Sequence, residues 1–421
     1  MAKVNSALRV GFAIYRGNPR CGGQGVYTRH LTRELVNLGV NVEVFSGPPY
    51  PHLDEGVKFT AVPSLDLYRS PDPFRLPKLS EFKDRYDFLE YMIMLTAGFP
   101  EPRVFSMRLR KMLQARVGDF DLIHDNQSLG TGLLGIKKDG FPLIATIHHP
   151  ITVDRELDLM HATSFRRRIS LKRWYGFLDM QRKVAPRIDR IITVSNSSKK
   201  DVSAQLGVDI SRMNVVPVGV DHNVFRPIRG SKKIAGRLMT TASADVPMKG
   251  LLPLLEALAK VRTEIDAHLV VIGSLKKESK IPRTLERLAL IQHVKFVHNL
   301  SDEDIVKLYS ECEVAVVPSL YEGFSLPAIE AMACGVPVLT TTGGALPEVV
   351  GENGKSALLV PPNDPSALAH GIVTLLKSQK LRQDLGKQGR ERVLSRYTWQ
   401  VTAQGTLDQY IQLLDERDKS N

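Results

Sequence analysis

Short apolar runs of strand length alternate with helical stretches along most of this chain, and this alternation constrains its fold more than any other feature. Such alternation is typical of parallel sheets with crossover helices. A chain of 421 residues also exceeds one ordinary hydrophobic core. The early strand-like runs are Leu8–Ile14, Val40–Phe45, Leu122–His124, Pro142–Ile147 and Arg190–Val194. The later ones are Asn214–Pro217, Arg237–Ala242, His268–Ile272, Val294–Val297, Val314–Pro318 and Val336–Thr340. Two sets of strands predict two Rossmann-like halves, with the boundary between Ser195 and Asn214.

The stretch 318–337 predicts a buried strand, a glycine-containing loop, a helix opened by Ser325 and a second buried strand. Glu322 lies in the loop, and Glu330 lies about one turn into the helix. Unpaired backbone N–H groups and the helix dipole favour an anion at such a helix start. Phosphates held by amides, with carboxylates nearby for hydroxyls, indicate a sugar nucleotide.

The spacing of Glu322 and Glu330, with the runs Gly343-Gly344-Ala-Leu-Pro-Glu348 and Leu358-Leu-Val-Pro-Pro-Asn-Asp364, resembles family 4 of the retaining nucleotide-sugar glycosyltransferases, of the group 1 type. The resemblance covers nearly the whole chain and is strongest over residues 215–362. It implies an α/β protein with the GT-B fold, in which two Rossmann-like doubly wound domains face each other across a cleft. It also implies retaining transfer of a hexose from a nucleotide-diphosphate sugar to an acceptor hydroxyl.

The resemblance implies two domains, one that binds the acceptor and one that binds the donor. An N-terminal acceptor-side domain is expected over residues 1–212, completed by a C-terminal helix at 400–421, because in this family the final helix crosses back to the first domain. A donor-binding domain is expected over residues 213–399. The segment 65–118 is longer than a simple crossover, and we interpret it as an elaboration of the first domain.

Lys249 precedes a helix that we expect near Leu251, which suits neutralisation of a diphosphate. That charge matters because negative charge builds on the leaving nucleoside diphosphate as the glycosidic bond breaks. Without the resemblance, a solvated surface lysine is the ordinary interpretation. The family usually has an arginine six positions earlier, where this chain has Ser243.

The remaining donor contacts are also implied by the resemblance. Glu330 would accept hydrogen bonds from ribose hydroxyls, and Glu322 would meet sugar hydroxyls. Gly273 ends a predicted strand, so the nucleotide can approach its backbone closely. The full donor-binding set is Gly23, Lys249, Gly273, Glu322, Gly323, Phe324, Ser325, Leu326 and Glu330.

A glycine-rich loop, residues 21–25, follows the first strand in the usual phosphate-cradling position of a first βα turn. A dinucleotide fold would require a third glycine where this chain has Thr28, and no acidic residue clearly ends the second strand. The dinucleotide interpretation is therefore poor. In the resembled family this loop faces the cleft, where Gly23 meets donor phosphate or acceptor and Gly22 lies on the acceptor side.

His148 follows the strand 142–147 and matches the cleft histidine of the family, which implies a hydrogen bond to the 6-hydroxyl of the donor sugar. A structural histidine or a two-histidine metal site with His149 are the alternatives. Adjacent residues of an extended chain point to opposite faces, so the two rings would not easily share one metal. Asp125 and Asn126 also end a strand and are expected on the acceptor side.

The predicted chemistry uses no metal. Asp119-Phe120-Asp121 has the Asp-x-Asp pattern that binds manganese in the other large glycosyltransferase fold, but it precedes a buried strand, so we interpret it as strand entry. No side chain stands out as a covalent nucleophile. We expect a front-face route in which His148, Lys249 and Glu322 supply placement and charge stabilisation.

Composition adds two constraints. The formal net charge is +12, which favours phosphate-rich partners such as nucleotides, anionic lipid or nucleic acid. The three cysteines cannot all pair, and Cys312 and Cys334 lie in apolar segments, which suits a reducing cytoplasm. No signal-peptide layout and no bilayer-length apolar run is evident.

Two basic segments carry interleaved apolar residues. One spans residues 165–178 and the other 103–116. Such mixtures bind anionic headgroups, yet a helix packed on its own core with solvated charges looks the same. If the membrane interpretation holds, the acceptor is a lipid or lipid-linked glycan at the inner face of the plasma membrane. The cations of the first segment are Arg166, Arg167, Arg168, Lys172 and Arg173.

Three alternatives to a glycosyltransferase stay open at this point. One is a GT-B enzyme of other chemistry, such as a phosphorylase or a sugar-nucleotide epimerase. Another is a basic nucleic-acid-binding protein, against which the sequence shows neither a stacking platform nor a recognition helix. The third is a catalytically inert binding module, suggested by Ser243.

Overall fold

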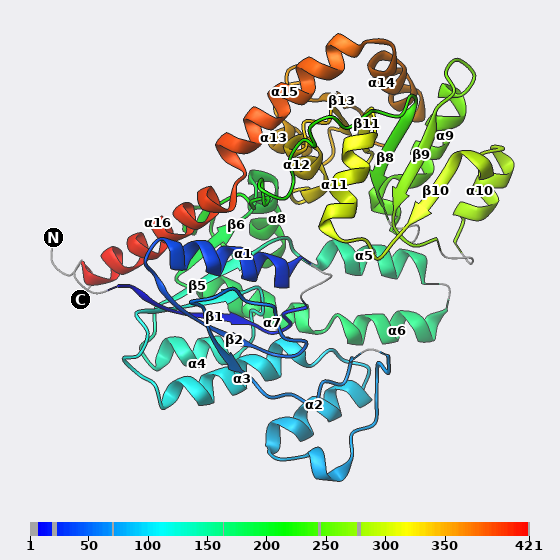
Figure 1. Cartoon of the computed structure of the whole chain (residues 1–421). Helices are drawn as coiled ribbons and strands as arrows, with labels where there is room; N and C mark the ends of the chain where they lie inside the picture. The colour runs from blue at the N-terminus through cyan, green and yellow to red at the C-terminus, as the bar shows by residue number, and fades with distance from the viewer. Residues whose placement is uncertain are drawn as a thin grey trace. The chain divides into compact units, whose positions relative to one another are not determined.

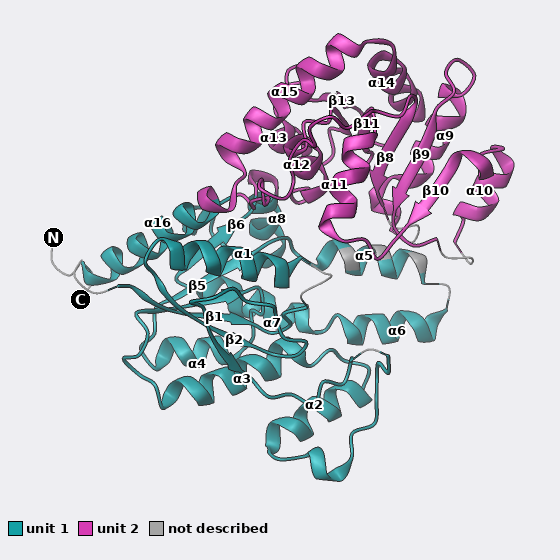
Figure 2. Ribbon diagram, in the orientation of Figure 1, with its two compact units in different colours: residues 1–194, 198–216, 402–421 teal, residues 195–197, 217–401 magenta. Residues whose placement is uncertain are grey.

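The computed structural model describes residues 7–18, 23–69, 71–162, 164–242, 246–275 and 279–419 (Figure 1). Two compact units share the chain (Figure 2). Unit 1 holds residues 1–194, 198–216 and 402–421, and unit 2 holds residues 195–197 and 217–401. Each unit contains one sheet whose described strands all run parallel, so the expected pair of Rossmann-like α/β halves is confirmed.

The sheet of unit 1 has the strand order β3-β2-β1-β4-β5-β6-β7. The chain moves outward from β1 in one direction, returns, and then builds the other side from β4, which is the doubly wound arrangement. Every residue of β4 and β5 is buried, as expected for central strands covered on both faces. The strands are β1 (Arg9–Ile14), β2 (Asn41–Ser46), β3 (Lys58–Ala61), β4 (Leu122–Asn126), β5 (Leu143–Ile147), β6 (Arg190–Thr193) and β7 (Met213–Val215).

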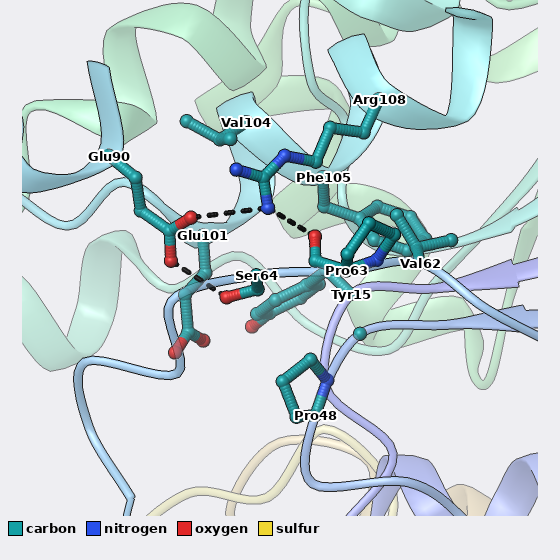
Figure 3. Close-up of a pocket in the computed structure, with 11 residues that line it drawn as sticks. Tyr15, Pro48, Val62, Pro63, Ser64, Glu90, Glu101, Val104, Phe105 and Arg108 are labelled. Carbon is teal, nitrogen blue, oxygen red and sulfur yellow. Dashed lines mark hydrogen bonds and ion pairs between the residues drawn. The ribbon is translucent and has the colours of Figure 1, made fainter. Parts of the chain in front are cut away.

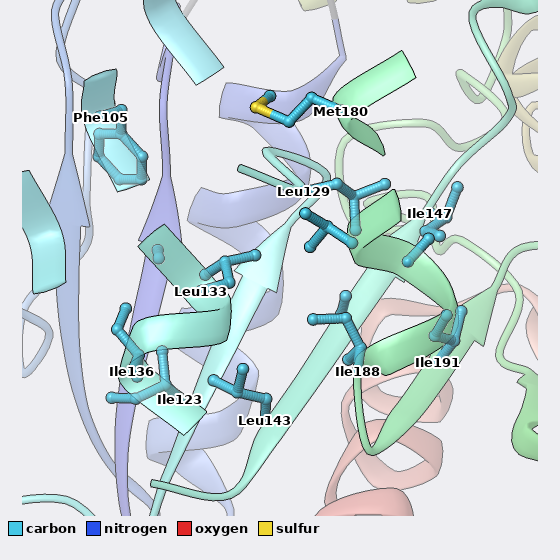
Figure 4. Close-up of a cluster of buried hydrophobic side chains, with 14 of the residues drawn as sticks. Phe105, Ile123, Leu129, Leu133, Ile136, Leu143, Ile147, Met180, Ile188 and Ile191 are labelled. Atoms are coloured by element: carbon cyan, nitrogen blue, oxygen red, sulfur yellow. The ribbon is translucent and has the colours of Figure 1, made fainter. Parts of the chain in front are cut away.

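Helices pack on this sheet through a continuous apolar core. Figure 4 shows part of that core, in which Phe105, Leu133 and Met180 from three different helices belong to one cluster with side chains of β4 and β5. Short 3-10 turns lie at Leu79–Glu81, Ala185–Arg187 and Ile210–Arg212. The helices are α1 (Gln24–Asn37), α2 (Arg85–Leu95), α3 (Glu101–Gln114), α4 (Gly132–Lys138), α5 (Thr152–His161), α6 (Phe165–Trp174), α7 (Phe177–Val184), α8 (Asn196–Leu206) and α16 (Trp399–Asp418).

The sheet of unit 2 has the order β10-β9-β8-β11-β12-β13, again doubly wound. Its strands are β8 (Arg237–Thr241), β9 (His268–Ile272), β10 (Val294–Val297), β11 (Val314–Val317), β12 (Val338–Thr341) and β13 (Leu358–Val360). Its helices are α9 (Leu251–Val261), α10 (Ile281–Arg287), α11 (Asp302–Glu311), α12 (Leu326–Ala333), α13 (Leu346–Val350), α14 (Pro365–Lys377) and α15 (Gln379–Arg396). Single 3-10 turns lie at Pro247–Lys249 and Ile291–His293.

One predicted strand was assigned to the wrong set. The run Asn214–Pro217 was expected to open the second sheet, but it forms β7, which pairs with β6 at the edge of the first sheet. The backbone N–H of Val216 continues this pairing by donating to the carbonyl of Thr193. The second sheet instead starts with β8, because α8 is long enough to bring the chain back beside β6.

The segment 65–118 forms α2, which contributes Met94 to a small satellite core, and α3, whose buried apolar residues join the main core of unit 1. Helix α3 buries its apolar face, and Arg108 within it is only 4% exposed, with Asp87 and Glu90 as ion-pair partners at 2.5 and 3.4 Å. These carboxylates offset the desolvation cost of the buried guanidinium. Because its apolar residues are buried, the structure favours the second interpretation of the basic stretch 103–116, a helix packed on its own core. Among the described helices, none combines the length and apolar character needed to cross a bilayer.

Candidate functional site

Unit 2 brings two of the predicted residues together at its topological switch point. Strands β8 and β11 are neighbours, and the chain leaves them in opposite directions. In open α/β sheets the ligand crevice lies at the carboxyl ends of such a strand pair. Lys249 follows β8 and Glu322 follows β11. Their side chains form an ion pair, with 2.7 Å between Lys249 Nζ and Glu322 Oε1. The hydroxyl of Ser319 donates to the same carboxylate oxygen at 2.7 Å.

Backbone packing fixes the relative positions of these two loops. Leu320 donates its N–H to the carbonyl of Met248 at 2.7 Å. Gly250 adopts φ +68°, and a Cβ placed there would lie 1.9 Å from the carbonyl oxygen of Pro318. Only glycine permits both the left-handed conformation and this approach. The ion pair of Lys249 and Glu322 therefore rests on two loops that touch through their main chains.

A third loop, after β12, holds the other side of the Glu322 loop. A Cβ at Gly343 would lie 2.3 Å from the carbonyl oxygen of Leu320. Ala345 donates its N–H to the carbonyl of Glu322 at 2.8 Å. The glycine pair that contributed to the family resemblance therefore has a packing role, because it lets the β12 loop lie against the loop that carries Glu322.

Helix α12 begins beside Glu322 without a side-chain cap. Ser325 lies at the N-cap with φ 119° and ψ 89°, so it precedes the helix as expected, but its hydroxyl does not cap it. Ser325 is 5% exposed, and its Oγ has no hydrogen-bond partner among the described residues. Open N–H donors at a helix start favour an anion. Phe324 packs edge-on against Tyr397 with 5.6 Å between ring centroids, which anchors this turn.

The other unit 2 predictions have different surroundings. Leu326, the first residue of α12, is half-buried, as is Glu330 in the same helix. Burial, assisted by the negative charge of Asp302, raises the pKa of the Glu330 carboxyl to about 7. The N–H of Gly273 donates to the carbonyl of Val297 at 2.8 Å. That amide extends the sheet, so it is not a free donor for a nucleotide.

In unit 1 the switch point lies between β1 and β4, and α1 starts there. Gly23 occupies the N-cap of α1 with φ +70° and is exposed. Gly22, Cys21 and Ser243 lie outside the described residues. A Cβ at Gly25 would lie 2.0 Å from the carbonyl oxygen of Asn18, so Gly25 lets the loop after β1 close over the start of α1.

His148 follows β5 and is joined to the end of β4. Its Nε2 lies 2.9 Å from Asn126 Oδ1, and the Tyr27 ring meets the imidazole edge-on at 4.7 Å between centroids. Burial, with a smaller contribution from His149, lowers the pKa of His148 to about 3. The imidazole is therefore neutral at physiological pH.

Asp125 has a local role that sequence reasoning did not predict. Its carboxylate accepts hydrogen bonds from the Ser128 hydroxyl and from the Leu129 N–H, the latter at 2.9 Å. The side chain is buried, and burial raises its pKa to about 6. Asn126, rather than Asp125, thus reaches His148.

Two supporting features were missed at the sequence level. Gln127 clamps the histidine loop, because its Oε1 accepts from the His148 N–H at 2.8 Å and its Nε2 donates to the His149 carbonyl at 2.7 Å. His124 is fully buried, with Thr146 Oγ1 at 2.8 Å on one nitrogen and Tyr410 Oη at 2.6 Å on the other. A polar side chain inside an otherwise apolar strand was the available signal for His124.

The Asp-x-Asp sequence is engaged with arginines. Asp121 pairs with Arg9 at 2.7 Å and Asp119 with Arg116 at 2.8 Å, at the entry to β4. Within the described part of the chain, no group of three or more histidine, cysteine, aspartate or glutamate side chains could hold a metal ion.

Two hollows lie apart from these residues. Figure 3 shows a small pocket in unit 1, where Glu90 pairs with Arg108 and accepts from Ser64. Its volume of about 10 Å³ approaches the least that holds one water molecule, so it cannot take a sugar. A wider surface hollow of about 490 Å³ in unit 2 is lined by Glu352, Lys355, Ser356, Gln388, Glu391, Arg392, Ser395 and Arg396. Neither contains a predicted site residue.

Comparison with known proteins gives matches along nearly the whole chain. The family profile "Glycosyltransferase Family 4" matches residues 21–224, and "Glycosyl transferases group 1" matches residues 229–392. The chain is 48% identical to an MMP α-(1→4)-mannosyltransferase of Mycolicibacterium hassiacum, over 96% of this chain and 98% of that protein. It is 27% identical to a D-inositol 3-phosphate glycosyltransferase of Catenulispora acidiphila, over 95% and 92% of the two chains.

Solved structures agree on the fold. Sucrose-phosphate synthase from Thermosynechococcus elongatus matches with a TM-score of 0.73 and 23% identity, covering 97% of this chain and 100% of that one. HepE from Anabaena, solved with UDP and glucose, matches with a TM-score of 0.67 and 17% identity, covering 96% and 99%. With two parallel α/β units and these relatives, the chain is a GT-B glycosyltransferase that belongs to glycosyltransferase family 4 and carries the group 1 glycosyl transferase domain.

Proposed function

We propose that the crevice between β8 and β11 binds the donor, a mannose carried by a nucleoside diphosphate. The observation that supports this most is the ion pair of Lys249 and Glu322 beside the uncapped start of α12. A pyrophosphate fits a cation and open amides, and hydroxyls fit a carboxylate. Glu330 lies farther along α12, where the ribose hydroxyls of the same donor would donate to it. Mannose is taken from the 48% identical relative, whose printed activity is α-(1→4)-mannosyl transfer.

The proposed reaction retains the anomeric configuration by a front-face route. The bond from the anomeric carbon to the β-phosphate oxygen breaks, and the acceptor hydroxyl oxygen bonds to that carbon on the same face. The departing phosphate oxygen takes the acceptor proton. Lys249 stabilises the charge that grows on the phosphate, and this requires it to move from Glu322 toward the pyrophosphate. Glu322 then meets the sugar hydroxyls.

We assign the acceptor to unit 1, near Gly22, Gly23, Asn126 and His148. The relative named for α-(1→4) linkage suggests a 4-hydroxyl of a mannoside as the attacking group. A neutral His148 suits a hydrogen bond to a sugar hydroxyl. The carboxylate of Asp125 already accepts hydrogen bonds from Ser128 and Leu129, so we do not include Asp125 among the proposed acceptor contacts.

A donor screen followed by turnover tests this proposal. UDP-, GDP- and ADP-mannose are compared for thermal stabilisation, since a ligand that binds only the native state raises Tm. Release of nucleoside diphosphate is then measured with a mannoside acceptor. K249A should lower turnover about 100-fold or more, in the range of lost charge stabilisation. E330A should also lower turnover sharply, because the donor loses its ribose contact. K355A, at an exposed lysine of the same unit, is the matched control. Near-normal turnover in K249A and E330A would refute the assignment.

We also propose that no metal is needed, so turnover should survive EDTA at full rate.

A second proposal concerns location, at the cytoplasmic face of a membrane. Helix α6 supports it, because Arg166, Arg167 and Arg168 are exposed and Phe165 and Ile169 beside them are 78% and 52% exposed. Cations with apolar side chains free to insert favour an anionic lipid surface.

A further inference from the structure

A chain of hydrogen bonds runs from α1 to the imidazole of His148. It begins at the main-chain carbonyl oxygen of Gln24, which can only accept a hydrogen bond. Thr28, one turn later in α1, donates its hydroxyl hydrogen to that carbonyl at 2.9 Å. A hydroxyl has a single hydrogen, so toward any other neighbour the Thr28 oxygen must accept.

That neighbour is the side-chain amide of Asn126, whose Nδ2 lies 3.3 Å from Thr28 Oγ1. The reverse amide orientation would place Oδ1 against an oxygen whose hydrogen is already used, leaving two acceptors face to face. Nδ2 therefore faces Thr28, and Oδ1 faces His148 Nε2 at 2.9 Å. Because Oδ1 only accepts, the hydrogen of this second bond must lie on Nε2.

The rest of the surroundings fixes the imidazole ring as well as its hydrogen. Burial lowers the pKa of His148 to about 3, so the ring carries one hydrogen at neutral pH. With that hydrogen on Nε2, Nδ1 holds a lone pair. Nδ1 has no hydrogen-bond partner among the residues that the structure describes. The Tyr27 ring stands at 89° to the imidazole and restricts its rotation.

The main chain of His148 is held equally firmly. Its N–H donates to Gln127 Oε1 at 2.8 Å, and its carbonyl accepts from the Ser198 hydroxyl at 3.0 Å. Both peptide groups of the residue are thus engaged by side chains of neighbouring elements. The half-buried imidazole is the one part of His148 left with an open polar atom.

We propose that Thr28 and Asn126 are positioning residues that lock His148 in the Nε2–H tautomer, so that Nδ1 is an obligate acceptor for a substrate hydroxyl. His148 then selects a sugar that carries a hydroxyl hydrogen at the contacted carbon. A sugar with a deoxy or methoxy group there has no hydrogen to donate, so it would leave Nδ1 unpaired. This ligand class rests on the proposed function, whereas the tautomer lock does not.

The tautomer is measured directly by two-bond ¹H–¹⁵N NMR of the histidine rings, without substrate. The H148Q spectrum identifies the His148 signals. In the wild type we expect a protonated Nε2 and an unprotonated Nδ1, unchanged between pH 5 and 8. T28V removes the accepting oxygen, so both tautomers should be populated, and T28S should restore the single one. T32V is the matched control, because Thr32 is buried in α1 and makes the same backbone bond, to the Thr28 carbonyl at 2.8 Å. A protonated Nδ1 in the wild type, or an unchanged T28V spectrum, overturns the lock.

Kinetics test the substrate contact. In T28V, kcat/KM should fall about tenfold for the natural sugar and should fall less for the analogue lacking the hydroxyl, with T28S and T32V close to wild type. Unchanged kcat/KM in an active T28V enzyme overturns the contact. If the wild type turns over no nucleotide sugar, the proposed function fails, but the NMR result still decides the lock. The two failures are therefore distinguishable.

Discussion

At the scale of single residues, close backbone contact explains the glycine at position 250, beside the proposed donor site. Gly250 and Gly207 have nearly the same φ, +68° and +69°, but only Gly250 has backbone in the way of a Cβ. We expect G207A to cost about 1 kcal/mol for its left-handed conformation alone. G250A should cost clearly more and weaken donor binding, because the loop bearing Pro318 must shift. Denaturant unfolding of both variants gives the comparison, and equal losses would contradict the close packing.

Glu330 should make stability depend on pH in a specific direction. Its folded pKa of about 7 lies above the ordinary value of 4.5. The unfolded state therefore releases its proton first as pH rises, so the contribution of this carboxyl to stability falls between about pH 4.5 and 7. E330Q cannot ionise, so its Tm minus the wild-type Tm should increase over that interval. A difference that stays flat with pH would show that the carboxyl is not perturbed.

The family resemblance predicted Lys249 and Glu322 at one donor site although 73 positions separate them, but it did not predict their ion pair. The sequence could not predict the open hydroxyl of Ser325 or the hydrogen-bonded amide of Gly273. Those depend on the main-chain angles of a turn and on sheet pairing past a strand's end. Asp125 shows the same limit, since its use by Ser128 and Leu129 follows from the turn after β4.

At the scale of elements, α3 and α6 show that composition alone does not distinguish a buried helix from an exposed one. Both mix arginines with apolar residues. Helix α3 gathers its apolar residues on one face and buries them, including Leu109 and Leu113, whereas α6 buries only Leu171 among the residues described. Strands β3 and β13 were missed because both are short, and β3 is mostly exposed. Burial on one face, which decides these cases, comes from tertiary packing.

Helix α16 contributes to the core of unit 1 through a buried polar contact. Its Tyr410 lies 2.6 Å from a nitrogen of His124, which burial keeps neutral by lowering its pKa to about 3. Y410F removes that partner and leaves a buried nitrogen unpaired, at a cost of about 1–3 kcal/mol. I411A, on the exposed side of the same helix, should change the free energy of unfolding by well under 1 kcal/mol. Chemical denaturation measures both, and equal effects would argue against the contact.

At the scale of the whole molecule, the net charge of +12 favours any anionic partner. A test of membrane binding must therefore distinguish attraction by the net charge from binding at a specific surface. Substrate binding and lipid binding would both weaken with salt, because exposed charges are screened. Location distinguishes them. The proposed donor site uses Lys249 in unit 2, whereas the exposed cations of α6 lie in unit 1.

Vesicle flotation tests the α6 surface with charge held constant between variants. R166Q/R167Q/R168Q removes three charges from α6, and R287Q/K355Q/K377Q removes three exposed charges from unit 2. Each basic residue near an anionic bilayer contributes about 1 kcal/mol, so the α6 variant should bind anionic vesicles roughly 100-fold more weakly at low salt. The unit 2 variant should bind like the wild type, and neutral vesicles should bind none of the three. Equal weakening of both variants would mean that net charge alone attracts the protein to the vesicles. An absence of anionic preference in the wild type would refute the membrane proposal, because the exposed Phe165 and Ile169 would then have no lipid to enter.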